Sequence, residues 1–213
     1  MKTEYLVALL AAGDITPPGP AAGRLYATAC GRGGLIAILL MLTFLKFRPD
    51  LLQALWLPMF WVKIGFAAAL AAVGLFAVLR LSRPGARLTW LPLALALPLL
   101  AIWALAAISL ANALPEEHSA LFFGKTWMVC PLLIALLSIP VFRMVFQVMR
   151  EMAPTRPALA GSAAGLLSGA VATLVYCLHC PEMGAPFVGF WYLLGILIPT
   201  TVGAIVGNKT LKW

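Results

Sequence analysis

Long apolar stretches alternate with short polar loops along this chain. Five stretches hold about 20 mainly apolar residues, the length that an α-helix needs to cross a bilayer core of roughly 30 Å. They lie near residues 59–79, 88–110, 126–148, 157–178 and 186–207. A sixth stretch, near residues 27–46, contains Arg32, which is close enough to one end to reach the headgroups. The pattern predicts an all-α integral membrane protein, a bundle of six transmembrane helices. If 27–46 were instead a re-entrant segment, the orientation of every later span would reverse.

The basic residues are divided unevenly between alternate loops. With both termini placed inside, the outer side holds only Lys46, Arg48, Lys63 and Lys125, balanced by the acidic residues Asp50, Glu116, Glu117 and Glu182. The inner segments hold Lys2, Arg24, Arg32, Arg80, Arg83, Arg87, Arg143, Arg150, Arg156, Lys209 and Lys212. Because positively charged loops stay in the cytoplasm, the N-terminus and C-terminus are both predicted to be cytoplasmic. The net charge of +8 therefore reflects topology, and we expect no direct contact with nucleic acid.

Composition supports the membrane prediction and narrows the function. Hydrophobic residues make up 63% of the chain and charged residues 10%, which is too little polar surface for a soluble protein of this size. No Asp, Glu or His lies near a span centre, so ion-coupled transport is not favoured. Lys63 and Arg143 are expected to reach the headgroups from positions near span ends. No catalytic motif is present in the sequence, and we do not expect an enzyme.

Residues 1–24 form a predicted cytoplasmic tail ahead of the bundle of residues 25–213. Tyr5, Leu6, Leu9 and Leu10 follow helical spacing, which predicts a short amphipathic helix over residues 3–12 before a Pro-rich spacer. A helix of about ten residues is marginal in water by itself. It therefore requires a surface to bind, either the lipid bilayer or a groove on a cytosolic partner.

One face of the fifth span is made of small residues. Gly161, Gly165 and Gly169 form a repeated small-xxx-small pattern, which allows two helix backbones to approach closely. The pattern fits either a homodimer face or packing between helices of one bundle.

Three of the four cysteines fall at the outer ends of the fourth and fifth spans, while Cys30 is on the inner side. If those spans are neighbours, a disulfide between Cys130 and Cys180 is geometrically feasible. Cys177, His179 and Cys180 also have the residue types of a soft-metal site, with Glu182 nearby and His118 in the adjacent outer loop. Three interpretations stay open: a redox or stress-sensing pair, transient heavy-metal binding, and structural packing. No permanent cofactor is predicted.

Several strings of residues, taken in order, resemble the NrsF-like membrane anti-sigma factors. They are residues 6–10, 47–51 (FRPDL), 58–63 (PMFWVK), 83–86 (RPGA), 153–157 (APTRP), 179–182 (HCPE) and 185–187 (APF), followed by Trp191 and Tyr192. The resemblance covers nearly the whole chain. It implies a six-span protein of the bacterial inner membrane that keeps an extracytoplasmic-function sigma factor inactive and releases it under envelope or metal stress. It also implies that a sensing pair of outer cysteines falls on Cys130 and Cys180.

The resemblance therefore implies a stress-response regulator of transcription that senses on its outer face and binds a partner on its inner face. The outer cysteines would sense the stress, and Tyr5, Leu6, Leu9 and Leu10 are the candidate sigma-binding residues. The alternative is an envelope thiol-redox or metal-binding membrane protein without a sigma partner. Deleting the tail separates the two hypotheses, because only the first has a use for it.

Overall fold

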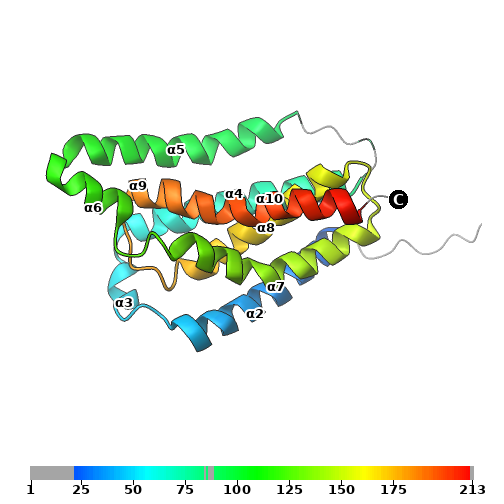
Figure 1. Cartoon of the computed structure of the whole chain (residues 1–213), viewed down its shortest axis with the longest axis horizontal. Coiled ribbons are helices and arrows are strands. Elements are labelled where there is room, and N and C mark those ends of the chain that lie inside the picture. Colours follow the sequence, from blue (N-terminus) through cyan, green and yellow to red (C-terminus); the bar gives the residue numbers. More distant parts are fainter. Residues whose placement is uncertain (1–21, 84, 86–88, 212–213) are drawn as a thin grey trace, which may run out of the picture.

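The computed structural model describes residues 22–83, 85 and 89–211, and these residues form helices joined by turns and short loops (Figure 1). The predicted partner-binding residues Tyr5, Leu6, Leu9 and Leu10 lie outside the described residues. Six helices are long and apolar enough to span a membrane: Ala22–Leu45, Pro58–Leu81, Leu91–Asn112, Cys130–Glu151, Pro157–Tyr176 and Ala185–Thr210. The prediction of six membrane-length helices is therefore confirmed.

The spanning helices carry the labels α2, α4, α5, α7, α8 and α10. Two of them include a π-helical segment: α2 (Ala22–Leu40) continues into η1 (Met41–Leu45), and α9 (Ala185–Phe187) and η3 (Val188–Tyr192) lead into α10 (Leu193–Thr210). The others are α4 (Pro58–Leu81), α5 (Leu91–Asn112), α7 (Cys130–Glu151) and α8 (Pro157–Tyr176). Three short helices, α3 (Leu51–Ala54), η2 (Pro115–Glu117) and α6 (His118–Phe123), lie in the connections.

Two spans begin four or more residues away from the predicted start. The first span starts at Ala22 rather than residue 27. The helix is continuous through Arg32, whose side chain is exposed and so adds no buried charge to the bundle. A continuous helix of membrane length replaces the re-entrant alternative. The fourth span starts at Cys130 rather than residue 126, since Thr126–Val129 form a turn in which the Thr126 carbonyl accepts the Cys130 amide at 2.9 Å.

Helix α8 is the centre of the bundle and contacts α2, α4, α7 and α10. Its small residues allow this, because a Cβ added at Gly161 would collide with the backbone of Gly203 in α10, and one at Gly165 with the carbonyl of Pro199. Gly169 lies against Ile196 in the same way. The glycine face is therefore occupied by α10 of the same chain, which matches the intramolecular alternative and leaves no room there for a second copy.

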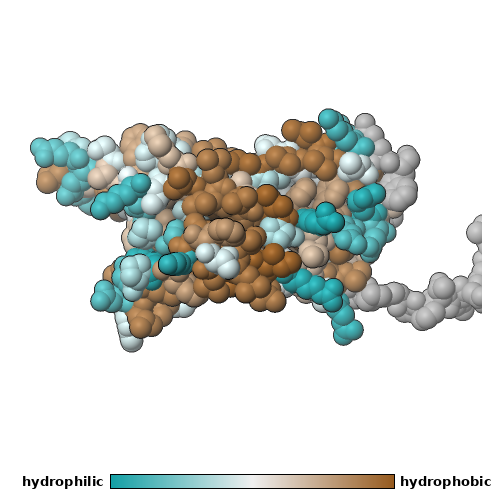
Figure 2. Space-filling model, turned by 60° about the horizontal axis from the view of Figure 1, so that its bottom comes forward, coloured by the Kyte–Doolittle hydropathy of each residue, from teal (hydrophilic) through white to brown (hydrophobic). Residues whose placement is uncertain are grey.

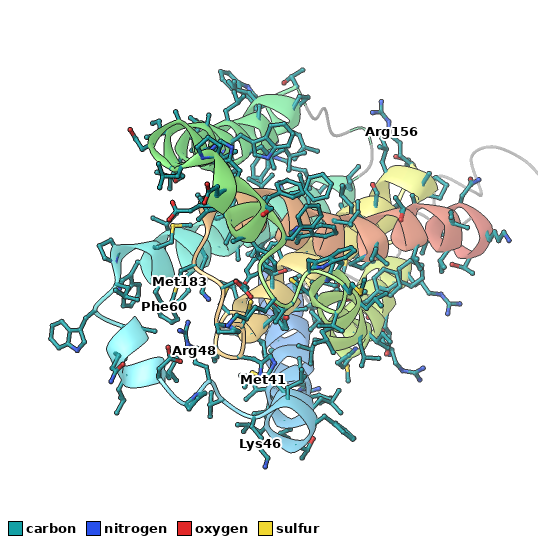
Figure 3. All side chains as sticks on the ribbon, turned by 60° about the vertical axis from the view of Figure 1, so that its left-hand side comes forward. Met41, Lys46, Arg48, Phe60, Arg156 and Met183 are labelled. Carbon is teal, nitrogen blue, oxygen red and sulfur yellow. The ribbon has the colours of Figure 1, made fainter. Side chains whose placement is uncertain are left out.

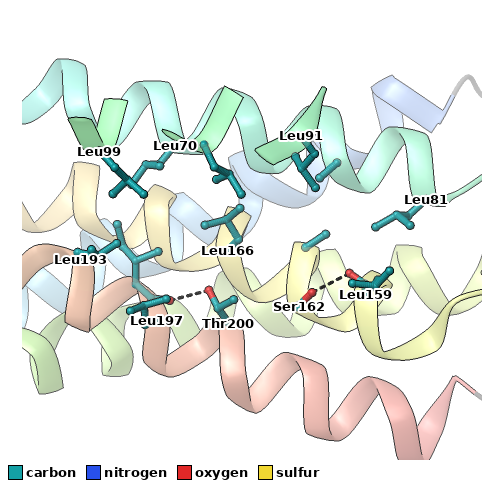
Figure 4. A pocket seen from close by; sticks show the side chains of 14 residues that line it. Leu70, Leu81, Leu91, Leu99, Leu159, Ser162, Leu166, Leu193, Leu197 and Thr200 are labelled. Carbon is teal, nitrogen blue, oxygen red and sulfur yellow. Dashed lines mark hydrogen bonds between the residues drawn. The ribbon is translucent and has the colours of Figure 1, made fainter. Parts of the chain in front are cut away.

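Helix α5 lies at the edge of the bundle (Figure 1), and Ile102 is its one buried residue. Between α5 and the helices α4, α8 and α10 there is an apolar cavity of about 210 Å³ (Figure 4). Leucines such as Leu99, Leu166 and Leu197 line it, and the hydroxyls of Ser162 and Thr200 bond to carbonyls of their own helices.

The surface is divided as a membrane protein requires. On the face shown in Figure 2, apolar residues cover the middle of the molecule and polar residues gather at the two ends. Helix α2 begins and α10 ends at the same end of the bundle, which we call the inner end (Figure 1). The opposite, outer end carries the connections with Lys46, Arg48, Lys125 and Glu182, and it also carries three cysteines.

Candidate functional site: a buried thiol cluster at the outer end

Three cysteines meet at the outer end of the bundle. Cys130 is the first residue of α7, and Cys177 and Cys180 follow the last residue of α8. All three side chains are fully buried, and all are free thiols. The structure brings Cys130 and Cys180 together because α7 and α8 are packed neighbours, the condition under which the sequence made a disulfide feasible. Cys177 joins the same cluster, beside Cys180 and Tyr192.

The segment of residues 177–184, here called the outer segment, is held by hydrogen bonds from α4, from the connection after η1 and from the connection before α7. From the connection after η1, the His179 ring nitrogen Nδ1 lies 2.8 Å from the Lys46 carbonyl, and the Arg48 amide donates to the Leu178 carbonyl at 3.3 Å. The Arg48 guanidinium also donates to the Cys180 carbonyl at 3.4 Å. Figure 3 shows Lys46 and Arg48 at this end of the molecule, with Met183 of the outer segment nearby and Arg156 well away from them.

Glu182 ties the outer segment to the connection between α6 and α7. Its carboxylate accepts the Lys125 amide at 2.8 Å and the Thr126 hydroxyl at 3.5 Å. Gly124 has φ +55°, and a Cβ there would lie 2.6 Å from a Glu182 carboxylate oxygen. A glycine is needed at this position both for its backbone conformation and for the close approach of Glu182.

Lys63 of α4 corrects the sequence prediction. Instead of reaching the headgroups, it is completely buried, and its ammonium group donates to the Cys180 carbonyl at 2.8 Å and to the Glu182 carbonyl at 3.4 Å. The Nζ atom also lies 5.5 Å from the centre of the Phe60 ring. Backbone carbonyls of a segment far away in sequence accept two of the three hydrogen bonds that the ammonium group can donate.

The two cysteines of the outer segment differ in acidity. The Cys130 thiol, acting as a hydrogen-bond donor, lowers the pKa of Cys180 from 9.0 to about 6, and the charge of Lys63 acts in the same direction. Burial raises the pKa of Cys177 to about 12. Since the thiolate is the reactive form of cysteine, the lowered pKa makes Cys180 the candidate nucleophile of the two.

Two tyrosines complete the cluster. The rings of Tyr176 and Tyr192 are 5.9 Å apart, and both lie beside the cysteines. The hydroxyl oxygen of Tyr192 is buried without a hydrogen-bond partner among the described residues. A tyrosine hydroxyl without a partner in this position can donate a hydrogen bond to a negatively charged cysteine sulfur.

The structure does not assemble the sequence-predicted metal ligands. His118 bonds to the Leu110 carbonyl at 2.9 Å, and Glu182 is held by Lys125 and Thr126. Over the described ranges, no group of three or more His, Cys, Asp or Glu residues is placed to hold a metal ion. Transient heavy-metal binding stays a prediction.

Lys63, Arg48 and Tyr192 were not predicted from the sequence to be parts of the site. The lone lysine inside an apolar span was the one signal that could have indicated it.

These features define a protein with six helices of membrane length and three buried thiols gathered at one end. The family described as "negative regulator of sigma F" matches residues 10–213. The chain is 62% identical to the "Probable anti-sigma-F factor NrsF" of Azospira oryzae and 40% identical to the "Anti-sigma-F factor NrsF" of Caulobacter vibrioides, each over the full length of both proteins. The chain belongs to the NrsF family. No solved structure matches it.

Proposed function

We propose that this protein is a membrane anti-sigma factor that holds an extracytoplasmic-function sigma factor at the bacterial inner membrane and releases it when the outer thiols react. The observation that carries the proposal is the full-length identity of 62% to a protein named as an anti-sigma-F factor. The six spanning helices supply the membrane anchor, and the role is regulatory rather than catalytic.

The orientation in this proposal follows from charge. Described basic residues at the inner end include Arg24, Arg80, Arg150, Arg156 and Lys209, whereas the outer end has mixed signs. The positive end would face the cytoplasm, where the sigma factor is, and the thiol cluster would face the oxidising side of the membrane. Signal and response are then on opposite sides, and the bundle connects them.

The sensing half of the proposal rests on the Cys130–Cys180 pair. The two thiols are free and interact with each other, and the pKa of Cys180 is lowered, which favours oxidation to a disulfide. Formation of that bond would draw the start of α7 and the outer segment together. A coupling free energy of about 1–3 kcal/mol between the outer and inner faces changes sigma-factor affinity about 5- to 150-fold.

The binding half is tested by purification. The tagged full-length protein, extracted from its native host in mild detergent, is expected to carry a stoichiometric sigma factor. Deleting residues 2–16 should remove the sigma factor while leaving the protein in the membrane, because the Tyr5, Leu6, Leu9 and Leu10 face is the proposed contact. Absence of any sigma factor from the unstressed full-length protein would instead favour the stand-alone thiol-redox or metal-binding alternative.

A further inference from the structure

Two cationic side chains converge on one backbone carbonyl, that of Cys180. Lys63 Nζ donates to this oxygen at 2.8 Å from α4, and Arg48 Nη1 donates to it at 3.4 Å from the connection after η1. Within the ranges that the structure describes, these are the two charged residues that are buried. The position of Cys180 is therefore set by two charges that reach it from different elements.

The charges in this arrangement do not balance. Arg48 pairs with Asp50 at 2.6 Å, and that carboxylate is 47% exposed. Lys63 is fully buried, and its printed hydrogen-bond partners are two neutral carbonyls. A buried ammonium group without a counter-charge is strongly unfavourable. The sulfurs of Cys177 and Cys180 are both near Lys63. Cys180 also accepts a hydrogen bond from the Cys130 thiol, which favours its negative form, and the orphaned hydroxyl of Tyr192 is close to the same sulfur.

We propose that Lys63, with Arg48 as a second donor, is a positioning residue that holds Cys180 beside Cys130 and frees the outer segment once the Cys180 sulfur loses its negative charge. This inference rests on the proposed role of Cys130 and Cys180 as the reacting pair. It explains how loss of charge on the Cys180 sulfur would lead to movement of the outer segment.

The chemistry balances with a peroxide as the oxidant. The Cys180 thiolate attacks one peroxide oxygen, the O–O bond breaks, hydroxide leaves, and a sulfenic acid forms. The Cys130 sulfur then attacks the Cys180 sulfur and gives up its proton to the departing hydroxide, which leaves as water. Two electrons pass from the two sulfurs to the peroxide. Both sulfurs are neutral in the disulfide, so Lys63 stays charged and buried without its counter-charge, and the segment bonded to it moves toward water.

The positioning role is tested by the rate of disulfide formation in the purified full-length protein. Hydrogen peroxide is added, the reaction is quenched by alkylation, and the Cys130–Cys180 bond is quantified by peptide mass spectrometry. Lys63→Met should slow bond formation at least tenfold, and Lys63→Arg should restore it to within about threefold. Leu70→Ala is the matched control, since Leu70 is buried about two turns further along α4. It should lower thermal stability without changing the rate.

A rate for Lys63→Met equal to that of the unchanged protein would overturn the proposal. If that variant yields no folded protein, Arg48→Gln tests the same arrangement from outside the spans and should slow the reaction at least threefold; no change would contradict the proposal.

Movement is measured separately by hydrogen exchange of the amides of residues 178–184. Oxidation should speed their exchange at least tenfold in the unchanged protein. The Cys180→Ser variant, which lacks the negative charge, should exchange fast before oxidation and should not change after it. Unchanged exchange after oxidation would overturn the release of the segment. Neither readout contains the sigma factor, so failure of sigma release with these results intact would count against the proposed function alone.

Discussion

Gly161 of α8 and Gly203 of α10 touch backbone to backbone, each close to the carbonyl group of the other. No residue with a side chain allows this approach, because even a single Cβ would overlap the facing carbonyl. The contact fixes α10 against the central helix at the inner half of the bundle. It is therefore a structural position on which the placement of α7, α8 and α10 depends.

Gly161→Ala should force α8 and α10 apart and destabilise the fold by about 1–3 kcal/mol, the usual cost of overpacking. Unfolding in mixed detergent, followed by circular dichroism, measures the loss. Gly65→Ala is the control, since Gly65 is an exposed glycine of α4 with nothing within 4 Å of an added Cβ. That change should be neutral or stabilising by about 0.5–1 kcal/mol. Equal effects of the two substitutions would contradict the packing described.

The acidity of Cys180 predicts how its reactivity depends on pH. Because the Cys130 thiol and Lys63 lower the pKa of Cys180 to about 6, its alkylation rate should reach a plateau near neutral pH and fall below pH 6. Cys177, with a pKa raised to about 12 by burial, should stay unmodified over this range. The measurement is the rate of iodoacetamide labelling against pH, read by peptide mass spectrometry.

Removing the Cys130 thiol, which donates to Cys180, should shift the pH profile of Cys180 alkylation to higher pH. In Cys130→Ala the half-maximal rate should shift by at least one pH unit, whereas Cys130→Ser keeps a hydroxyl donor and should shift less. The lowered pKa of Cys180 also makes the free energy of unfolding depend on pH, because folding favours the thiolate. The stabilisation by the thiolate is complete above pH 9 and is lost as the pH falls to about 6. A profile with its midpoint near 9 in the unchanged protein would show that Cys180 is an ordinary thiol.

Tyr26 joins three spanning helices at the inner end. Its buried hydroxyl lies 2.8 Å from the Ser82 hydroxyl at the end of α4 and donates to the Met149 sulfur of α7 at 3.4 Å. Tyr26→Phe should cost about 0.5–1.5 kcal/mol of unfolding free energy, and Ser82→Ala a similar amount. A double-mutant cycle checks the pairing, since the combined variant should lose less than the sum. Strict additivity would mean that the two hydroxyls do not interact.

The spans could be predicted from the sequence because each helix is mostly apolar over its length and each connection is short. Predicted boundaries were less exact where local hydrogen bonds set the helix start. Helix α7 begins one turn later than the apolar pattern suggested, after a turn in which the Thr126 carbonyl accepts the Cys130 amide. Arg32 weakened the first span on a hydropathy count, yet its exposed side chain leaves the helix intact. The glycine pattern predicted a close contact correctly but could not say which helix provides the other side.

The site was only half visible in the sequence. Topology places Cys130, Cys177 and Cys180 at the outer ends of two spans, and the resemblance implies that Cys130 and Cys180 are the sensing pair. The role of Lys63 depends on carbonyls more than a hundred residues away, at Cys180 and Glu182, and no local pattern reveals such partners. Cys177 was named from the sequence as a possible metal ligand, and the turn after α8 places it inside the thiol cluster. Tertiary contacts of the outer segment, rather than spacing, determine which polar groups meet.

The central claim is that reaction of the outer thiols releases a sigma factor from the inner face. The most direct measurement is the amount of sigma factor that stays bound to the purified, immobilised complex before and after hydrogen peroxide. The account predicts release from the unchanged protein, and retention by a Cys130→Ser plus Cys180→Ser variant that binds equally well before oxidation. Equal retention by both proteins, or release from both, would contradict it.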